Sequence, residues 1–220
     1  MGYFSDKALD AAARAAQMKQ EMKGRTPDQK AVIKYFYGAN GCLAKGLTDE
    51  TYDAMVKAKV EALNFPAKAL AKLGVDESEV NEITPVHFEG YNYDKSYALM
   101  GKDGKWRSSA YEITWIFFSD KQVFVYKYLF NMDEDGKKET TYEYFYKDVT
   151  NFTTVSDSVE KTVLDKVSCT GKASFKRTTV DTDIFKIIVP GDSFTCYMSQ
   201  DEYSESAVQG MKAKLREKKG

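Results

Sequence analysis

The apolar residues of this 220-residue chain change their spacing at Pro85, and this change limits the fold more than any other feature. Before Pro85, apolar side chains recur three or four residues apart, as on one face of an amphipathic helix. After Pro85 they recur at every second residue, as in strands with a buried face. The sequence therefore predicts a helical region over residues 1–84 and a β-rich region over residues 85–220.

Signals for the start of a helix support the first region. Thr26 is followed by Pro27 and then by Gln29, which is the arrangement of a capping box with proline in the first turn. Thr48 is expected to begin a later helix, and Ser5 is expected to cap the first one.

Short alternating segments separated by turn residues dominate the second region. Strands are predicted over residues 86–93, 111–118, 123–130 and 140–146, and further strands around 149–155, 163–175, 184–189 and 194–198. A last helix, capped by Ser199 and Glu202, carries an apolar stripe of Ala207, Val208, Met211 and Leu215. We therefore expect an α+β fold in which an antiparallel barrel of about seven strands is closed by a C-terminal helix.

About seven strands followed by one amphipathic helix resemble a pleckstrin-homology (PH) domain. Four segments carry the resemblance: Glu89-Gly90-Tyr91, Lys105-Trp106-Arg107, residues 118–126 and Tyr146-Lys147-Asp148-Val149. Both tryptophans, Trp106 and Trp115, precede the final helix, where eukaryotic PH domains usually carry one. The bacterial PH-like branch is therefore the better match, and the resemblance implies a binding module over roughly residues 86–220.

Charge and cysteine content limit the partners and the compartment. The formal net charge is −1, and acidic and basic residues are balanced on both sides of Pro85, so no excess of positive charge favours nucleic acid. Three cysteines, Cys42, Cys169 and Cys196, are an odd number without a close pair, which is typical of reduced thiols. No apolar run approaches the roughly 20 residues that span a bilayer. We expect a cytoplasmic protein.

The residues that usually perform catalysis are sparse. The one histidine, His87, lies in a predicted strand without a nucleophile motif, and a single histidine excludes a two-histidine metal site. The glycine-rich segment 38–46 lacks the spacing of a phosphate-binding loop, because Gly46 follows Lys45 where that motif has serine or threonine. We therefore expect no enzyme activity, no cofactor and no metal ion.

A basic loop gives one candidate binding site. Lys102, Lys105 and Arg107 match the pattern with which some PH domains hold inositol phosphates, and converging cations can hydrogen-bond phosphate oxygens. The alternative interpretation is a solvated hairpin, since Asp94 and Asp103 dilute the positive charge.

Aromatic strand faces give a second candidate. Residues 111–146 are apolar on both faces, whereas a barrel buries only its inner face. One of two sets needs another cover: Phe124, Tyr126, Tyr128 and Phe130, or Val123, Val125 and Leu129. The N-terminal helices are favoured as that cover over a second copy of the chain.

These observations favour a non-catalytic recognition or scaffold module that contacts a partner protein or a second copy of itself. An aromatic strand face (Phe124, Tyr126, Tyr128 and Phe130) or a sheet edge is the expected contact surface, because PH-like modules use strand addition and grooves beside the helix. The alternative is an anionic-lipid-binding module that uses Lys102, Lys105 and Arg107. A third reading, a barrel that binds or hydrolyses a small molecule, would require a deep apolar pocket.

Overall fold

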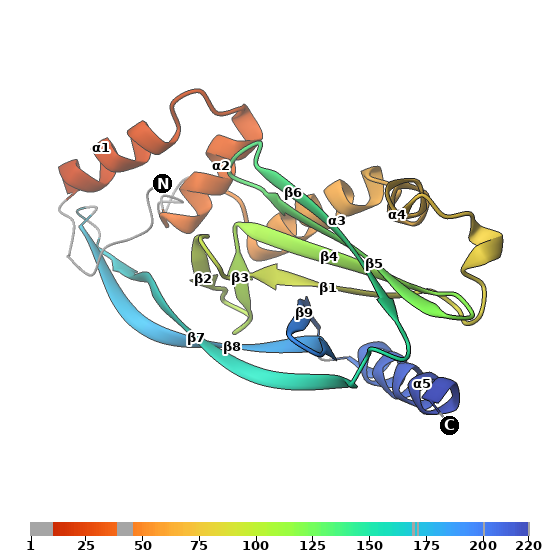
Figure 1. Ribbon diagram of the computed structural model, residues 1–220. Coiled ribbons are helices and arrows are strands. Elements are labelled where there is room, and N and C mark those ends of the chain that lie inside the picture. The colour runs from red at the N-terminus through yellow and green to blue at the C-terminus, as the bar shows by residue number, and fades with distance from the viewer. Residues whose placement is uncertain (1–10, 39–45, 169, 171, 200, 220) are drawn as a thin grey trace.

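The computed structural model describes residues 11–38, 46–168, 170, 172–199 and 201–219. The predicted cap at Ser5, most of the 38–46 segment, and Cys42 and Cys169 lie outside these residues. The described chain is a mixed α+β structure with antiparallel sheets and a C-terminal helix (Figure 1).

In the part of the chain that the structure describes, four helices precede the strands: α1 (Ala11–Glu21), α2 (Pro27–Phe36), α3 (Asp49–Ala62) and α4 (Phe65–Leu73). A single 3₁₀ turn, η1 (Glu77–Glu79), follows them. The capping box at Thr26 is confirmed, because its hydroxyl accepts the Gln29 N–H while the Gln29 side chain accepts the Thr26 N–H. The cap at Thr48 is confirmed by its hydrogen bond from the Thr51 N–H.

The strands form two main sheets and one short hairpin. The first sheet has the order β1 (Val86–Asn92), β4 (Ala110–Phe118), β5 (Gln122–Asn131) and β6 (Lys137–Phe145). The second has the order β7 (Asn151–Val167), β8 (Ala173–Val189) and β9 (Asp192–Met198). Strands β2 (Ala98–Met100) and β3 (Trp106–Ser108) pair with each other and with no other strand of the described residues. Within the described residues the strand pairing does not run around a closed cylinder, so the closed barrel is not observed.

The first sheet has a hydrophobic core on each of its faces. On one face, side chains of β4 and β5 pack against α2, α3 and α4, with Val32, Tyr52 and Phe65 among the buried helical residues. Figure 1 shows these helices along one side of the sheet and the curved β7–β8 hairpin along the other. The N-terminal helices, which were favoured as the cover of the second apolar face, therefore do cover it.

This cover corrects the expected aromatic contact surface. Phe124, Tyr126, Tyr128 and Phe130 are all buried, with exposed fractions of 7%, 0%, 4% and 1%. They face the helices because even-numbered residues of β5 share the helix-covered face with Ile113 and Phe117 of β4. In this arrangement none of the four is available to a partner.

The opposite face of the first sheet packs against the second sheet and helix α5 (Glu202–Lys219). Val208, Met211 and Leu215 of the predicted apolar stripe are buried there against Phe152, Phe185 and Ile187. Burial of such side chains contributes roughly 1.5–3 kcal/mol each. The stripe therefore holds the helix across one end of the space between the sheets.

The C-terminal half of α5 is also tied down by charge. Lys214 Nζ lies 2.6 Å from Glu82 Oε1, and Lys218 Nζ lies 2.7 Å from Asp120 Oδ1. These pairs join the helix to the segment before β1 and to the β4–β5 turn. The N-terminal half of the helix has no such ion pairs within the described residues.

Strands β7 and β8 differ from the expectation. The strands predicted around residues 149–155 and 163–175 are not separate, because β7 runs without interruption from Asn151 to Val167, and residues 173–175 already belong to β8. The intervening residues 156–162 and 176–183 are mostly polar, so they lack the one-sided apolar alternation that reveals a strand. Backbone pairing along the hairpin makes them strands regardless.

Candidate interaction groove

A groove opens where the inner face of the second sheet changes from apolar to polar. Along β7 that face carries Phe152, Thr154 and Ser156, and their partners on β8 are Ile187, Phe185 and Asp183. Phe152 and Ile187 are buried beneath α5, whereas Ser156 and Thr154 are exposed. Polar side chains retain their water, so the helix and the strands separate beyond this point.

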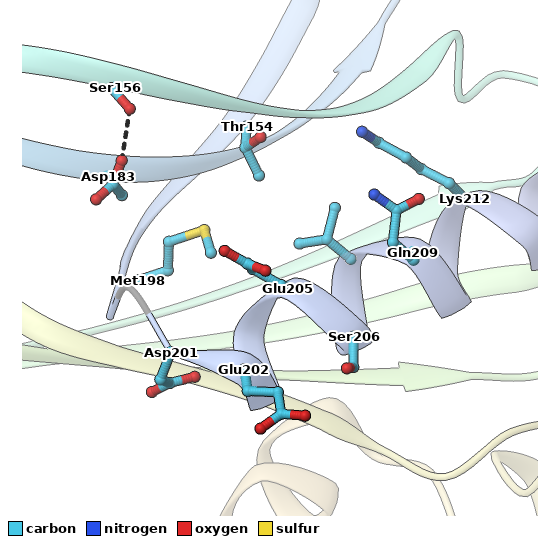
Figure 2. Close-up of a pocket in the computed structure, with 11 residues that line it drawn as sticks. Thr154, Ser156, Asp183, Met198, Asp201, Glu202, Glu205, Ser206, Gln209 and Lys212 are labelled. Carbon is cyan, nitrogen blue, oxygen red and sulfur yellow. Dashed lines mark hydrogen bonds between the residues drawn. The ribbon is translucent and has the colours of Figure 1, made fainter.

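The groove has a volume of about 1180 Å³ and is walled by β7 and β8 on one side and by the first turns of α5 on the other. Figure 2 shows Glu205, Gln209 and Lys212 projecting from α5 into the space between the helix and β7. Ser156 donates a 2.6 Å hydrogen bond to Asp183 across the strands, and Met198 lies at the end of β9. Val208 of α5 also lines the groove and makes its surface partly apolar.

The lining is strongly acidic. Four carboxylates, those of Asp183, Asp201, Glu202 and Glu205, face one lysine, Lys212, which gives a formal charge of −3. Glu202 and Glu205 are exposed and form no ion pair with any residue that the structure describes. A concave, low-dielectric wall strengthens the attraction of such a cluster for cations.

The start of α5 differs from the predicted cap. The Asp201 carboxylate accepts the Ser204 N–H at 2.7 Å, which makes Asp201 the capping side chain. Ser199 instead donates to the Glu89 carbonyl oxygen on β1 and joins the helix entry to the first sheet. Asp201 therefore has a structural role, whereas Glu202 and Glu205 are left facing solvent.

The groove continues into a neighbouring hollow at each end. Beyond Lys212, a second depression is lined by Leu215, Arg216 and Lys219. Beyond Asp183 and Met198, a third is lined by five aromatic residues together with polar ones that include Lys105 and Asp181. The acidic groove shares Lys212 with the basic depression and Asp183 and Met198 with the third one, so it adjoins both.

The predicted anion site is occupied by the protein's own carboxylates. Arg107 is buried, and it donates two hydrogen bonds to Asp53 (2.8 and 2.7 Å) and two to Asp103 (both 2.8 Å). Its Nη1 group also donates to the Lys105 carbonyl oxygen at 3.3 Å. Most of the five N–H donors of the guanidinium are therefore used within the protein. One positive charge faces the two carboxylates of Asp53 and Asp103, so the cluster has a net negative charge.

The pKa values of the two carboxylates agree with this pairing. Hydrogen bonds from Arg107 and from the Lys105 N–H hold the pKa of Asp103 well below its usual value. Burial alone would raise the pKa of Asp53, but hydrogen bonds from Arg107 and Tyr91 lower it. Lys102 and Lys105 are exposed on the loop, and the Lys102 N–H is bound by Asp49. The structure therefore does not bring the three basic groups together toward a ligand.

His87 and Cys196 have structural surroundings. The His87 ring stacks on Trp115 with centroids 4.8 Å apart, and its Nδ1 lies 3.2 Å from the Tyr203 hydroxyl. Cys196 is 1% exposed, and burial raises the pKa of its thiol well above the usual value. A thiol in this state is a poor nucleophile.

Comparisons of the chain with models of protein families, with curated proteins and with solved structures find no match. Among the helices of the described residues, none has both the length and the apolar character that crossing a bilayer requires. The described ranges also contain no group of three or more histidine, cysteine, aspartate and glutamate side chains placed to hold a metal ion. The groove is therefore interpreted from its own geometry.

The individual residues of the groove were not predicted from the sequence. Grooves beside the helix were expected from the resemblance, but the carboxylates that line this one come from β8 and α5, which only tertiary packing brings together. The available signal was the change from Phe152 to Thr154 and Ser156 at alternating positions. It marks the point where the core ends.

Proposed function

We propose that this chain is a non-catalytic recognition module of the PH-like type, which binds an extended, positively charged segment of a partner protein in the groove beside α5. Seven strands in two antiparallel sheets followed by one helix support the PH-like assignment. The likeness lies in strand order and helix position, since the sheets do not close within the described residues. The surroundings of His87 and Cys196 support a role without catalysis.

The acidic lining of the groove carries this proposal. Glu202 and Glu205 are exposed on a wall of a 1180 Å³ groove whose formal charge is −3. Lysine or arginine side chains of a partner would donate charge-assisted hydrogen bonds to these carboxylates, and electrostatic attraction would speed the association of the partner. An extended segment fits a groove bounded by a strand on one side and a helix on the other.

Two alternatives have less support from the geometry. Anionic lipid would meet a basic loop whose buried member, Arg107, already has two carboxylate partners. Self-association through the aromatic face of β5 would require the N-terminal helices to leave it.

A random 12-residue peptide library displayed on phage tests the proposal. Selection on the full chain is expected to enrich peptides rich in lysine and arginine, whose binding weakens as salt is raised. The Glu202→Gln/Glu205→Gln double variant removes two groove charges and is expected to lose this enrichment. The Glu77→Gln/Glu143→Gln double variant removes two exposed carboxylates that do not line the groove and is the matched control.

Two results would contradict the proposal. One is selection of peptides without basic residues, and the other is equal enrichment by the Glu202→Gln/Glu205→Gln variant and its control. Urea unfolding of both variants verifies that the fold is retained.

A further inference from the structure

The hollow next to the acidic groove has unusual walls. Five aromatic side chains line it, Tyr91, Tyr93, Trp106, Tyr111 and Tyr197, and its volume is about 540 Å³. Tyrosine and tryptophan are the residues most enriched where one protein anchors a side chain of another, because they offer large rigid surfaces at a low cost in entropy. We call this depression the aromatic hollow.

The walls of the aromatic hollow are fixed before any ligand binds. Tyr91 and Tyr111 pack edge to face with centroids 5.2 Å apart, and Tyr93 packs edge to face with Tyr197 at 6.5 Å. The Tyr91 hydroxyl donates a 2.7 Å hydrogen bond to Asp53, which is itself held by Arg107. A preorganised site loses little freedom on binding, so more of its contact energy becomes affinity.

Gly90 of β1 also lines the aromatic hollow. Gly90 lies inside strand β1 and has no left-handed backbone angle that would require glycine. A Cβ atom built there would stand 3.5 Å from Tyr197 Cβ and 3.9 Å from the Met198 backbone, which is ordinary contact. Packing against β9 therefore permits a Cβ at this position, although glycine inside a strand weakens the strand. Replacement by alanine would add one methyl group beside Tyr197, which also lines the hollow.

Position connects the aromatic hollow to the acidic groove. Asp183 and Met198 line both, so the hollow adjoins the groove. From these observations, and resting on the proposed function, we infer that the aromatic hollow receives an aromatic or branched apolar side chain of the same basic segment. The partner motif would then contain basic residues for the groove and one apolar anchor at a fixed distance along the segment.

The Gly90→Ala variant tests this inference, because it adds one methyl group to the lining of the hollow, beside Tyr197, without a clash. Peptides selected on the unaltered chain are expected to share one aromatic or branched apolar position in addition to their basic residues. The affinity of such a peptide, measured by fluorescence anisotropy, is expected to fall at least tenfold for Gly90→Ala. The Gly210→Ala variant of α5, where a Cβ meets nothing within 4 Å, is the matched control and should retain the affinity.

Tryptophan fluorescence gives a second measurement. Trp106 lines the aromatic hollow, whereas Trp115 lies outside it beside His87. In a Trp115→Phe background, binding of the selected peptide should shift the emission of Trp106.

The outcomes separate the two proposals. Three results would contradict the apolar anchor without contradicting binding in the acidic groove. These are basic peptides without a shared apolar position, an unchanged affinity for Gly90→Ala, and an unchanged Trp106 emission. Selection of peptides that lack basic residues would overturn the proposed function and, with it, the anchor.

Discussion

Replacing Arg107 by methionine separates a structural role of this side chain from an anion-binding role. The change removes the guanidinium and retains an apolar stem of similar length in the buried site. Arg107 joins the β2–β3 hairpin to helix α3, because Asp103 belongs to the hairpin loop and Asp53 to the helix. Loss of the guanidinium leaves both carboxylates without their main partner.

The magnitude follows from how much water reaches those carboxylates. Removing one partner of a fully buried ion pair typically costs about 3–5 kcal/mol. The Asp53 and Asp103 side chains are 46% and 36% exposed, so they recover part of their hydration. We therefore expect the free energy of unfolding to fall by about 2–3 kcal/mol. For a chain of this size that corresponds to a drop in Tm of roughly 4–12 °C.

Urea unfolding at pH 7, followed by circular dichroism, measures this change. Lys105→Met removes the same charge from an exposed position of the same loop and is expected to change stability by less than about 0.5 kcal/mol. Binding to anionic liposomes should be the same for Arg107→Met and for the unaltered protein. An equal stability of the two variants, or a loss of liposome binding specific to Arg107→Met, would refute the structural interpretation.

Two further predictions concern acid and the helical cover. Burial by itself would raise the pKa of Glu139, but hydrogen bonds from Lys137 and Tyr126 lower it to about 2. The ionised Glu139 therefore stabilises the fold fully above its pKa in the unfolded chain, near 4.5, and this stabilisation is lost as the pH falls through 2. The urea midpoint of Glu139→Gln should thus lie below that of the unaltered protein at pH 7 and converge with it near pH 2; a constant gap would contradict this. A chain of residues 85–220 alone would expose the sheet face that contains Phe117 and Tyr126, so light scattering should detect its association. A stable monomer would show that the helical cover is dispensable.

Much of the fold could be predicted because its signals are local. The capping box at Thr26 needs only Pro27 and Gln29, and the alternation from Tyr111 to Phe118 is contained in one strand. Apolar residues on both faces of that strand correctly indicated a second cover, since each face must be buried against something.

The errors come from contacts that are distant in the sequence. Arg107 was interpreted from its basic neighbours, but Asp53, 54 residues earlier, determines its state. The middle of β7 has polar residues on both faces, and only pairing with β8 makes it a strand. Phe124 to Phe130 seemed available because their cover comes from helices encoded far upstream.

The candidate site could be predicted in kind and not in detail. A groove beside the last helix was expected, yet its charge depends on β8 and α5 meeting at one place. No local pattern around Asp183 or Glu205 indicates that these carboxylates face each other across a groove.

The long hairpin has a consequence for how this chain folds. Its far end returns to the beginning of the chain: Leu164 and Val167 lie so close to Gly38 that a Cβ on that glycine would overlap Leu164. Partners more than 120 residues apart must therefore find each other before the native arrangement is complete, and such non-local closure slows folding. The helical and strand regions also share side-chain contacts throughout, so heat or urea should melt them in a single cooperative transition.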